Sequence, residues 1–363
     1  MDTTQLPQNR YHRQMLLPQI GPEGQRKLAA ARVLLVGCGA LGTVLAEQLV
    51  RAGVGYLRIA DRDIVELSNL QRQVLFDEED VRQCLPKAVA AANRLGRINS
   101  SVRIDPQVVD VHASNIEELA GLDSSVFGND RGGRQAVDLI LDGTDNVETR
   151  YLINDLSAKL RIPWIYGAVI ATEGRVMPIL PGRTPCLRCI FPEPPAPGEL
   201  ATCDTAGVLG SAVNVVASFQ AAIAMKILTG NQAAVAEELI TLDLWANRML
   251  SVSVKDARRE DCPTCAQRRF EFLNAVDGPG TTSLCGRNAV QIRPSTRQTL
   301  NLEQVASRLA HAGQVSKTPY FVRCSLADPA GAALTVFPDG RVIVHGTQES
   351  MRARSIVARF VGI

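Results

Sequence analysis

The chain contains 363 residues, of which 46% are apolar and 21% are charged, and its formal net charge is +2. This length accommodates one large α/β domain and a second, smaller domain. A net charge this close to zero gives no electrostatic reason to expect a nucleic-acid partner or an anionic membrane partner. The first ten residues contain no apolar signal-peptide core, so we expect a cytoplasmic protein.

The first 180 residues alternate between apolar runs of strand length and helical patterns. Residues 32–36 are a continuous apolar run, which is typical of a parallel strand buried on both faces. We predict strands at residues 32–36, 56–60, 102–109, 137–142, 164–169 and 174–179, and helices at 41–51, 79–95 and 147–160. This order predicts a Rossmann-like α/β fold with a doubly wound, mostly parallel sheet, and an antiparallel extension where the last two strands form a hairpin.

Two later segments are rich in proline or glycine, and we interpret them as connections. Residues 192–203 are Pro-rich and end at a cysteine, and residues 276–282 form a linker. We therefore predict a large domain at 1–275 and a small C-terminal α+β domain at 283–363, with its own helix and hairpin. Residues 207–225 are weakly charged but interrupted by polar side chains, which favours a buried helix over a membrane span.

A glycine-rich turn follows the first predicted strand and precedes a predicted helix. Gly37, Gly39 and Gly42 form the pattern G-x-G-x-x-G, with Ala40 inside it. Glycines let the backbone turn sharply and approach a phosphate, and the helix N-terminus supplies amide donors and a partial positive charge. Asp61 ends the second strand, where a carboxylate can accept hydrogen bonds from a ribose. The turn predicts a bound nucleotide but does not distinguish NAD from ATP.

Charged side chains further along the chain favour ATP. Residues 68–73 read Ser-Asn-Leu-Gln-Arg-Gln, Lys87 follows them, and Asp145 comes after a later strand. A dehydrogenase has no need for an arginine, a lysine and an aspartate directed at the same phosphates, whereas adenylation does. Arg72 and Lys87 can stabilise the charge on departing pyrophosphate, and Asp145 can hold Mg²⁺ against the phosphates. The amides of Asn69 and Gln71 can orient the triphosphate by hydrogen bonds.

Taken together, these motifs make the chain resemble the E1-like superfamily, which includes bacterial molybdopterin- and thiamin-pathway adenylyltransferases and the ubiquitin-activating enzymes. The resemblance spans about residues 8–270, and it rests on residues 10–14 (RYHRQ), 37–42 (GCGALG), 61–63, 68–73, Lys87 and 144–146. Ala40 stands where many relatives have glycine, which is a small change. The resemblance implies ATP-dependent adenylation of the C-terminal glycine carboxylate of a small sulfur-carrier or ubiquitin-like protein. Such carriers typically end in Gly-Gly.

The resemblance also implies roles for individual residues. Gly39 and Asp61 would contact the nucleoside, and Arg72 and Lys87 would contact the phosphates. Asp145 would be the Mg²⁺-linked catalytic carboxylate. The full set of residues expected to contact the nucleotide is Gly37, Gly39, Ala40, Gly42, Asp61, Asp63, Ser68, Asn69, Gln71, Arg72, Lys87, Asp145 and Asn146.

Arg13 resembles the arginine that reaches into the active site of the partner subunit, which implies a homodimer. Three of these residues also have plainer interpretations. Arg13 fits a solvated position on the first helix, and Lys87 fits the polar face of an amphipathic helix. Asp145 fits the N-cap of the helix predicted at 147–160.

The nine cysteines are an odd number, which argues against a disulfide framework in a cytosolic chain. Cys186, Cys189, Cys262 and Cys265 form two C-x-x-C pairs, and four thiolates at this spacing suit tetrahedral Zn²⁺. Between the two pairs lie 72 residues, so zinc would join two distant segments at a closed, structural site.

Cys203 follows the Pro-rich segment and precedes the predicted apolar helix. A cysteine near a helix N-terminus can have a lowered pKa and act as a nucleophile. Its position resembles that of the cysteine with which some relatives form a thioester or acyl-disulfide with the carrier protein. The alternative is a non-catalytic thiol beside a helix end, and both interpretations stay open.

The predicted reaction begins when the carrier's carboxylate attacks the α-phosphate of ATP. A sulfur nucleophile, either Cys203 or an external persulfide donor, then opens the acyl-adenylate. Two other classes of protein fit parts of the sequence, namely a non-catalytic nucleotide-binding scaffold and an NAD-dependent oxidoreductase. The C-terminal domain is too short for a rhodanese domain, and the sequence does not decide whether it holds the carrier or only packs in the dimer.

Overall fold

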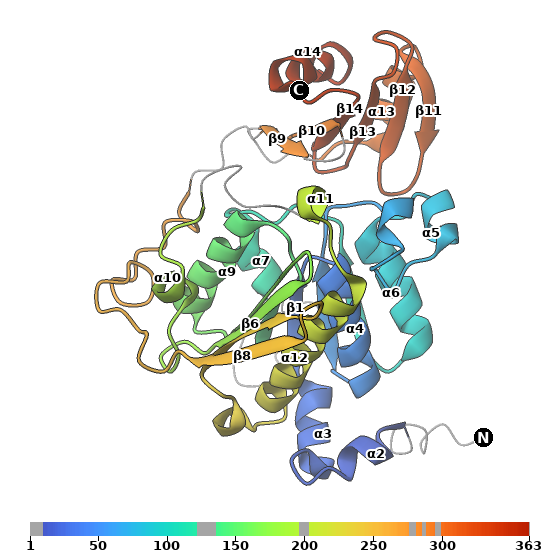
Figure 1. Cartoon of the computed structure of the whole chain (residues 1–363). Coiled ribbons are helices and arrows are strands. Elements are labelled where there is room, and N and C mark those ends of the chain that lie inside the picture. The colour runs from blue at the N-terminus through green and yellow to red at the C-terminus, as the bar shows by residue number, and fades with distance from the viewer. Residues whose placement is uncertain are drawn as a thin grey trace, which may run out of the picture. The chain divides into compact units, whose positions relative to one another are not determined.

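The computed structural model describes residues 10–121, 136–195, 203–275, 281–284, 288–294 and 299–362 (Figure 1). The chain divides into two compact units, residues 1–275 and residues 276–363. Residues 276–280, which form most of the predicted linker, lie outside the described part of the chain, and residues 281 and 282 belong to a strand rather than to a linker.

The first unit contains an eight-stranded sheet with the strand order β3-β2-β1-β4-β5-β6-β7-β8. Its strands are β1 Arg32–Val36, β2 Tyr56–Ala60, β3 Arg103–Gln107, β4 Leu139–Asp142, β5 Trp164–Ile170, β6 Glu173–Ile179, β7 Glu238–Asp243 and β8 Arg248–Ser253. Strands β1 to β5 are parallel, and β6 to β8 extend the sheet with antiparallel pairs. The predicted parallel sheet with an antiparallel extension is confirmed.

The register of the parallel strands brings their carboxyl ends to one edge. Val36, the last residue of β1, pairs with Ala60 at the end of β2 and with Asp142 at the end of β4. Ligands of open α/β sheets bind at this edge, where the strand order reverses direction along the chain. The order here changes direction between β1 and β4, so this position is the expected place for a nucleotide.

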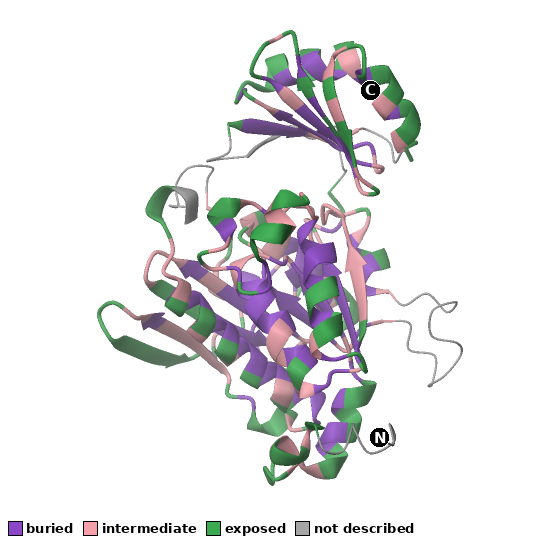
Figure 2. Cartoon of the chain, turned by 90° about the vertical axis from the view of Figure 1, so that its right-hand side faces the viewer, coloured by how far each residue is buried: buried purple, intermediate pink, exposed green. Residues whose placement is uncertain are grey.

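Helices cover both faces of this sheet and enclose two hydrophobic cores. Val33 and Leu35 of β1 point into one core, and Leu34 and Val36 point into the other, because side chains alternate along a strand. The buried strands lie between helices in Figure 2. The first core contains α3 Gly21–Ala30, α4 Ala40–Ala52, α6 Lys87–Ile98 and α12 Gly210–Leu228; the second contains α7 Ile116–Ala120, α9 Val147–Leu160 and α10 Leu187–Ile190.

Helix α12 is the core helix expected from residues 207–225. Among the described residues it is the one helix long and apolar enough to cross a membrane by length and composition. Its most apolar window is 56% buried inside the protein, where it packs against α4, β5 and β6. Burial of this kind is typical of the central helix of a doubly wound fold.

The single helix predicted at 79–95 is wrong, because the structure has two helices there. Helix α5 (Glu78–Arg82) is capped by Asp77, whose carboxylate accepts hydrogen bonds from the amides of Glu79 and Asp80. The chain then breaks at Cys84, which has a φ of 50°, before α6 begins at Lys87. Pro86 precedes Lys87 and disfavours helical backbone at the residue before it, which explains the break.

The hairpin of β7 and β8 was not predicted from the sequence. Every residue of β8 is exposed, so the strand lacks the buried face that would produce an alternating apolar pattern. Several of the exposed large apolar side chains gather in this hairpin: Trp245, Met249, Leu250 and Val252. Strand β8 is therefore the uncovered outer strand of the sheet.

The second unit is an α+β domain, as predicted. Its antiparallel sheet has the order β11-β12-β13-β14-β10-β9. Helices α13 (Leu302–Leu309) and α14 (Ser350–Phe360) pack on it and share a hydrophobic core with Leu334 and Val344. The strands are β9 Thr281–Leu284, β10 Ala289–Ile292, β11 Gly313–Lys317, β12 Val322–Leu326, β13 Ala333–Val336 and β14 Val342–His345.

Candidate nucleotide site and metal centre

The glycine turn brings three backbone segments into direct contact. A Cβ atom added to Gly42 would lie 2.1 Å from the carbonyl oxygen of Gly37, and one added to Gly143 would lie 2.5 Å from the same oxygen. Gly37 itself has a φ of 88°, which favours glycine. The turn after β1, the first turn of α4 and the turn after β4 therefore fit together only because these three positions lack side chains.

Gly39 faces open space instead. A Cβ atom added there would meet one neighbour within 4 Å, the Nε2 atom of Gln73 at 3.8 Å. Gly39 is also the N-cap of α4, and among the described residues no side chain accepts a hydrogen bond from the first amides of this helix. An uncapped helix N-terminus next to an open glycine is suited to bind a phosphate.

Asp61 braces this turn from the end of β2. Its Oδ2 atom accepts a hydrogen bond of 2.6 Å from the amide of Cys38, and its Oδ1 atom accepts one of 2.7 Å from the amide of Asp63. Burial raises the pKa of the Asp61 carboxyl, and the positive charge of Lys87 opposes that rise. From the sequence we predicted that Asp61 accepts a hydrogen bond from a ribose. In the structure Asp61 also holds the glycine turn, and its carboxylate oxygens retain further lone pairs for a ribose.

Lys87 is the first residue of α6 and is almost fully buried, so its interpretation as a surface lysine is wrong. Its Nζ atom lies 2.9 Å from Oδ2 of Asp63. Its charge also acts on the Asp61 carboxyl and the Cys38 thiol, whose pKa burial raises. The break before α6 thus directs a buried cation toward the glycine turn.

The segment containing residues 68–72 begins within the short 3₁₀ helix of Leu67–Asn69. Asn69 is buried, and its Oδ1 atom accepts a hydrogen bond from the amide of Glu66, so its oxygen has a local structural role. Arg72 donates to the carbonyl of Ser68 at 2.9 Å. In the part of the chain that the structure describes, no carboxylate forms an ion pair with Arg72. Its charge is therefore available for an anionic ligand.

Asp145 is exposed after the turn that follows β4. The N-cap of α9 is Asn146, whose Oδ1 atom accepts a hydrogen bond of 3.0 Å from the amide of Thr149. The interpretation of Asp145 as an N-cap is therefore wrong. The carboxylate of Asp145 interacts electrostatically with Arg62 and Arg150. The structure thus leaves an exposed carboxylate close to two cations at the edge where the nucleotide is expected.

Sequence reasoning missed three polar residues at this edge. Arg62 forms an ion pair of 2.9 Å with Asp110, and Arg150 forms one of 3.0 Å with Asp142. Gln73 is buried beside Gly39, and its Oε1 atom has no hydrogen-bond partner among the described residues. Gln73 is the last residue of the motif at 68–73 but was given no role of its own, whereas nothing in the sequence indicates that Arg150 is directed back under the turn.

The structure does not bring Arg13 to this site within one chain. Arg13 is exposed on the short helix α2 (His12–Met15). The next residue, Gln14, donates to the carbonyl of Ala52, the last residue of α4. Helix α4 has 13 residues and is about 20 Å long, and the glycine turn is at its other end. Arg13 therefore lies at the far end of α4 from the turn.

The two cysteine pairs meet in one cluster. The Sγ atoms of Cys186 and Cys262 are 3.5 Å apart, those of Cys189 and Cys265 are 3.5 Å apart, and those of Cys186 and Cys189 are 3.9 Å apart. All four sulfurs lie within 4.8 Å of one another. Tetrahedral Zn²⁺ with bonds of about 2.3 Å requires sulfurs about 3.8 Å apart, so the cluster fits this ion.

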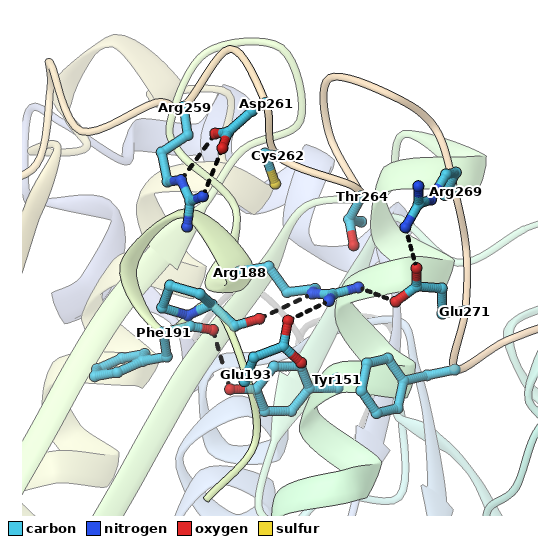
Figure 3. A network of polar contacts seen from close by, with 12 residues as sticks. Tyr151, Arg188, Phe191, Glu193, Arg259, Asp261, Cys262, Thr264, Arg269 and Glu271 are labelled. Atoms are coloured by element: carbon cyan, nitrogen blue, oxygen red, sulfur yellow. Dashed lines mark hydrogen bonds and ion pairs between the residues drawn. The ribbon is translucent and has the colours of Figure 1, made fainter.

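A neighbouring backbone amide favours the thiolate form that zinc requires. The amide of Arg259 donates to the Sγ atom of Cys189, and hydrogen bonds from the neighbouring thiols lower the pKa of Cys189. Arg188, between the two cysteines of the first pair, is buried and bridges Glu193 and Glu271 at 3.0 and 2.8 Å (Figure 3). Arg188 thus ties the two segments that carry the cysteine pairs to each other independently of any metal.

Cys203 is the first residue of the short helix α11 (Cys203–Ala206). Its side chain and residues 196–202 lie outside the described part of the chain. The position of its backbone at the start of a helix agrees with the expected segment boundary. Its role as a nucleophile stays a prediction.

Comparison with known proteins identifies the family. The sequence profile of the ThiF family matches residues 11–264. The chain is 44% identical to the sulfur carrier protein ThiS adenylyltransferase of Bacillus subtilis, over 97% of this chain and 99% of the relative. It is 40% identical to the sulfur carrier protein adenylyltransferase of Thermus thermophilus, over 71% of this chain and 90% of the relative.

Solved structures of MccB from Escherichia coli share the fold. The complex of MccB with MccA-N7isoASN has a TM-score of 0.60 and 20% identity, and the match covers 71% of this chain and 74% of MccB. The family match and the named relatives agree with the E1-like resemblance drawn from the motifs. The chain therefore belongs to the ThiF family.

Proposed function

We propose that this protein is an adenylyltransferase that uses ATP to activate the C-terminal glycine carboxylate of a small sulfur-carrier protein. The observation that carries the proposal is the set of groups at the carboxyl edge of the sheet. The uncapped N-terminus of α4 follows β1, the buried cation of Lys87 pairs with Asp63 after β2, and the exposed carboxylate of Asp145 follows β4. Arg72, which forms no ion pair among the described residues, adds a second cation. The names of the relatives support the choice of a sulfur carrier as the substrate.

In the proposed reaction, an oxygen of the carrier's carboxylate attacks the α-phosphorus of ATP. The bond from the α-phosphorus to the oxygen that bridges to the β-phosphate breaks, and pyrophosphate leaves with that electron pair. Lys87 and Arg72 stabilise the negative charge that builds up on the departing group, in a site where water is partly excluded. The product is an acyl-adenylate on the carrier's last glycine.

The residues present suit a Mg²⁺ ion on ATP, because Asp145 offers an exposed carboxylate that no helix cap occupies. When bound there, Mg²⁺ would act as a Lewis acid that withdraws charge from the phosphates. The side-chain oxygens of Asn146 and Asn69 accept hydrogen bonds from backbone amides of this chain. These oxygens are therefore not free to accept hydrogen bonds from a ligand. Asp61 holds the turn in place and retains lone pairs for the ribose.

The site of one chain lacks the arginine that the motif near the N-terminus supplies. Since Arg13 lies about one helix length away from the glycine turn, it can serve a nucleotide only in a second copy of the chain. This supports a homodimer in which each subunit completes the site of its partner. The exposed apolar side chains of Leu16 and Leu17 lie three and four residues after Arg13 and would be covered by such contact.

For the sulfur step that follows adenylation, we propose a class of nucleophile and not one residue. The acyl-adenylate would be opened by a sulfur nucleophile, which is either Cys203 or an external persulfide donor. Zn²⁺ held by the four clustered cysteines would have a structural role, since all four ligand positions are filled by protein. The absence of disulfides among the described cysteines and the buried position of α12 support a cytoplasmic location.

Carrier-dependent exchange of labelled pyrophosphate into ATP tests the proposal. We expect wild-type protein to catalyse exchange with one member of a panel of small Gly-Gly-tailed carriers, and not with the same carrier lacking its last two glycines. The Cys203→Ala variant should keep this exchange, because adenylation precedes the sulfur step. Tight ATP binding without exchange for any carrier would favour a non-catalytic scaffold and would contradict the proposal.

A further inference from the structure

A buried polar network lies directly under the turn that carries Asp145. Arg150 belongs to α9, but its guanidinium is directed back beneath the turn. Its Nε atom lies 3.0 Å from Oδ2 of Asp142, and its Nη2 atom donates to the carbonyls of Thr144 at 2.8 Å and Gly167 at 3.1 Å. One side chain thus connects the end of β4, the turn itself and the neighbouring strand β5.

Asp142 binds the peptide unit on the other side of Thr144. Its Oδ1 atom accepts a hydrogen bond of 3.0 Å from the amide of Thr144, and its Oδ2 atom accepts one of 3.3 Å from the amide of Gly167. The pair of Arg150 and Asp142 therefore binds both the N–H and the C=O of Thr144. Asp145 follows immediately, so the pair fixes the peptide from which the Asp145 side chain extends.

Close packing leaves the network little room to move. Gln220 of α12 donates to the carbonyls of Asp142 at 2.9 Å and Ile165 at 3.2 Å. A Cβ atom added to Gly167 would lie 2.4 Å from the Gln220 amide. The guanidinium of Arg150 also lies 5.4 Å from the ring centre of Tyr166. These contacts leave one position for the arginine.

The buried charge of Asp142 also requires Arg150 beside it. Asp142 is fully buried, and burial raises the pKa of its carboxyl while the charge of Arg150 opposes that rise. Without the arginine, Asp142 would be an unpaired carboxylate in the interior, which is strongly unfavourable. It would take up a proton or shift toward water, and the turn would move with it.

From these contacts we infer that Arg150 is a positioning residue for adenylation, which sets the backbone of Thr144 and Asp145 so that the Asp145 carboxylate faces the phosphates. The inference rests on the proposed function. Arg150 acts through Asp145 and is not itself a catalytic residue. A displacement of about 1 Å at a reacting group can lower a rate by roughly 10²-fold. A shift of this size in the Asp145 carboxylate would therefore measurably slow adenylation.

Arg58 provides a matched control, because the protein uses the same construction a second time. Its Nε atom lies 2.8 Å from Oδ2 of Asp105, and its Nη1 atom donates to the carbonyls of Leu119 and Gly121 at 2.8 and 2.9 Å. Its guanidinium lies 5.8 Å from the ring centre of Tyr56. Arg58, which also donates to the carbonyl of Glu118 at 3.3 Å, thus joins an acid, backbone carbonyls and a tyrosine as Arg150 does, but it holds the C-terminal end of α7 and not the turn of Asp145.

The experiment compares Arg150→Lys with Arg58→Lys in the full-length protein. Both variants keep the positive charge and lose the planar set of donors, so both should lower the melting temperature to a similar extent. We expect Arg150→Lys to lower the kcat of carrier-dependent pyrophosphate exchange by about 30- to 100-fold, with the KM for ATP within about threefold of wild type. For Arg58→Lys, kcat should stay within about threefold of wild type once activity is normalised to ATP-binding sites.

A double-mutant comparison shows whether Arg150 acts through Asp145. Asp145→Asn alone should lower exchange strongly, and adding Arg150→Lys should then cause no more than about a threefold further loss. Full additivity of the two losses, or wild-type kcat in Arg150→Lys, would overturn the inference. Arg150→Gln combined with Asp142→Asn, which leaves no unpaired buried carboxylate, replaces the lysine variant if that variant does not fold. Absence of exchange in the wild type with every carrier would instead overturn the proposed function, and the inference with it.

Discussion

The Nζ atom of Lys87 lies 2.9 Å from the Oδ2 atom of Asp63, and the lysine side chain is almost fully buried. Replacing Lys87 by Met removes a cation that the proposed reaction uses and leaves Asp63 without this ion pair. We expect exchange activity to fall by about 10²- to 10³-fold and the protein to lose about 1–3 kcal/mol of stability. Pyrophosphate exchange and chemical denaturation measure the two effects separately.

The double variant Lys87→Met, Asp63→Asn separates the structural and catalytic roles of this pair. Removing both charges should restore much of the lost stability, because no carboxylate remains without its partner. Exchange should stay low, because the cation near the phosphates is still missing. Recovery of exchange together with stability would show that Lys87 acts only through the fold.

Asp145→Asn should abolish exchange while leaving the fold intact. The carboxylate of Asp145 is exposed, and the cap of α9 is supplied by Asn146, so its charge supports no helix end. We expect a melting temperature close to that of wild type and a loss of exchange on the order of 10³-fold. Asn146→Ala is the contrasting variant, because losing the cap should cost about 1 kcal/mol of stability. Exchange retained in Asp145→Asn would remove this residue from the mechanism.

Mixed dimers test whether Arg13 acts across a subunit interface. Arg13→Ala and Asp145→Ala homodimers should each be inactive. In a mixed dimer, one site combines an intact Asp145 with an intact Arg13 from the other chain, so an equimolar random mixture should recover about a quarter of wild-type activity. If both residues served the same chain, mixing the two variants would restore nothing. Exchange rates measured after co-refolding give the answer.

Metal removal tests the cysteine cluster. We expect purified protein to contain one zinc ion per chain, and a strong chelator or the Cys262→Ser change to lower the melting temperature by roughly 10 °C or more, because a structural zinc contributes several kcal/mol. Cys324→Ser, which changes a buried cysteine outside the cluster, should leave the zinc content unchanged. Protein that lacks zinc but melts at the same temperature would contradict the structural role.

Removal of residues 276–363 tests the second unit. The first unit has its own hydrophobic cores, and the Thermus relative matches 71% of this chain over 90% of its own length. We therefore expect the 1–275 fragment to fold and to catalyse exchange with a kcat within about threefold of the full chain. A folded fragment with a greatly raised KM for the carrier would instead assign carrier binding to the second unit.

Much of the fold of the first unit could be predicted, because its signals are local. The apolar run at 32–36, the glycines that follow it and the helix at 147–160 each depend on a short stretch of sequence. The break before Lys87 was missed even though Pro86 was visible, since the helical pattern continues on both sides of it. Strand β8 was missed because it buries no face, so burial gives it no periodic pattern.

The candidate site was also predictable only in part from the sequence. The residue types that face the nucleotide follow from motifs, and the structure brings Gly39, Asp61 and Lys87 together at one edge of the sheet. The supporting residues do not follow from motifs. Arg150 lies in the second turn of α9, and its direction depends on Asp142, Gly167 and a helix 70 residues away, which no local pattern records.

Helix α12 has a consequence for the chain during its synthesis. This 19-residue apolar segment leaves the ribosome before β7 and β8 do, so part of its sheet is still missing at that time. Gln220, near its middle, donates to Asp142 and Ile165 in the folded protein. In a bilayer the same amide would be an unsatisfied polar group, which opposes insertion of the helix. The glutamine that fastens the finished core therefore also makes the nascent helix a poorer membrane segment.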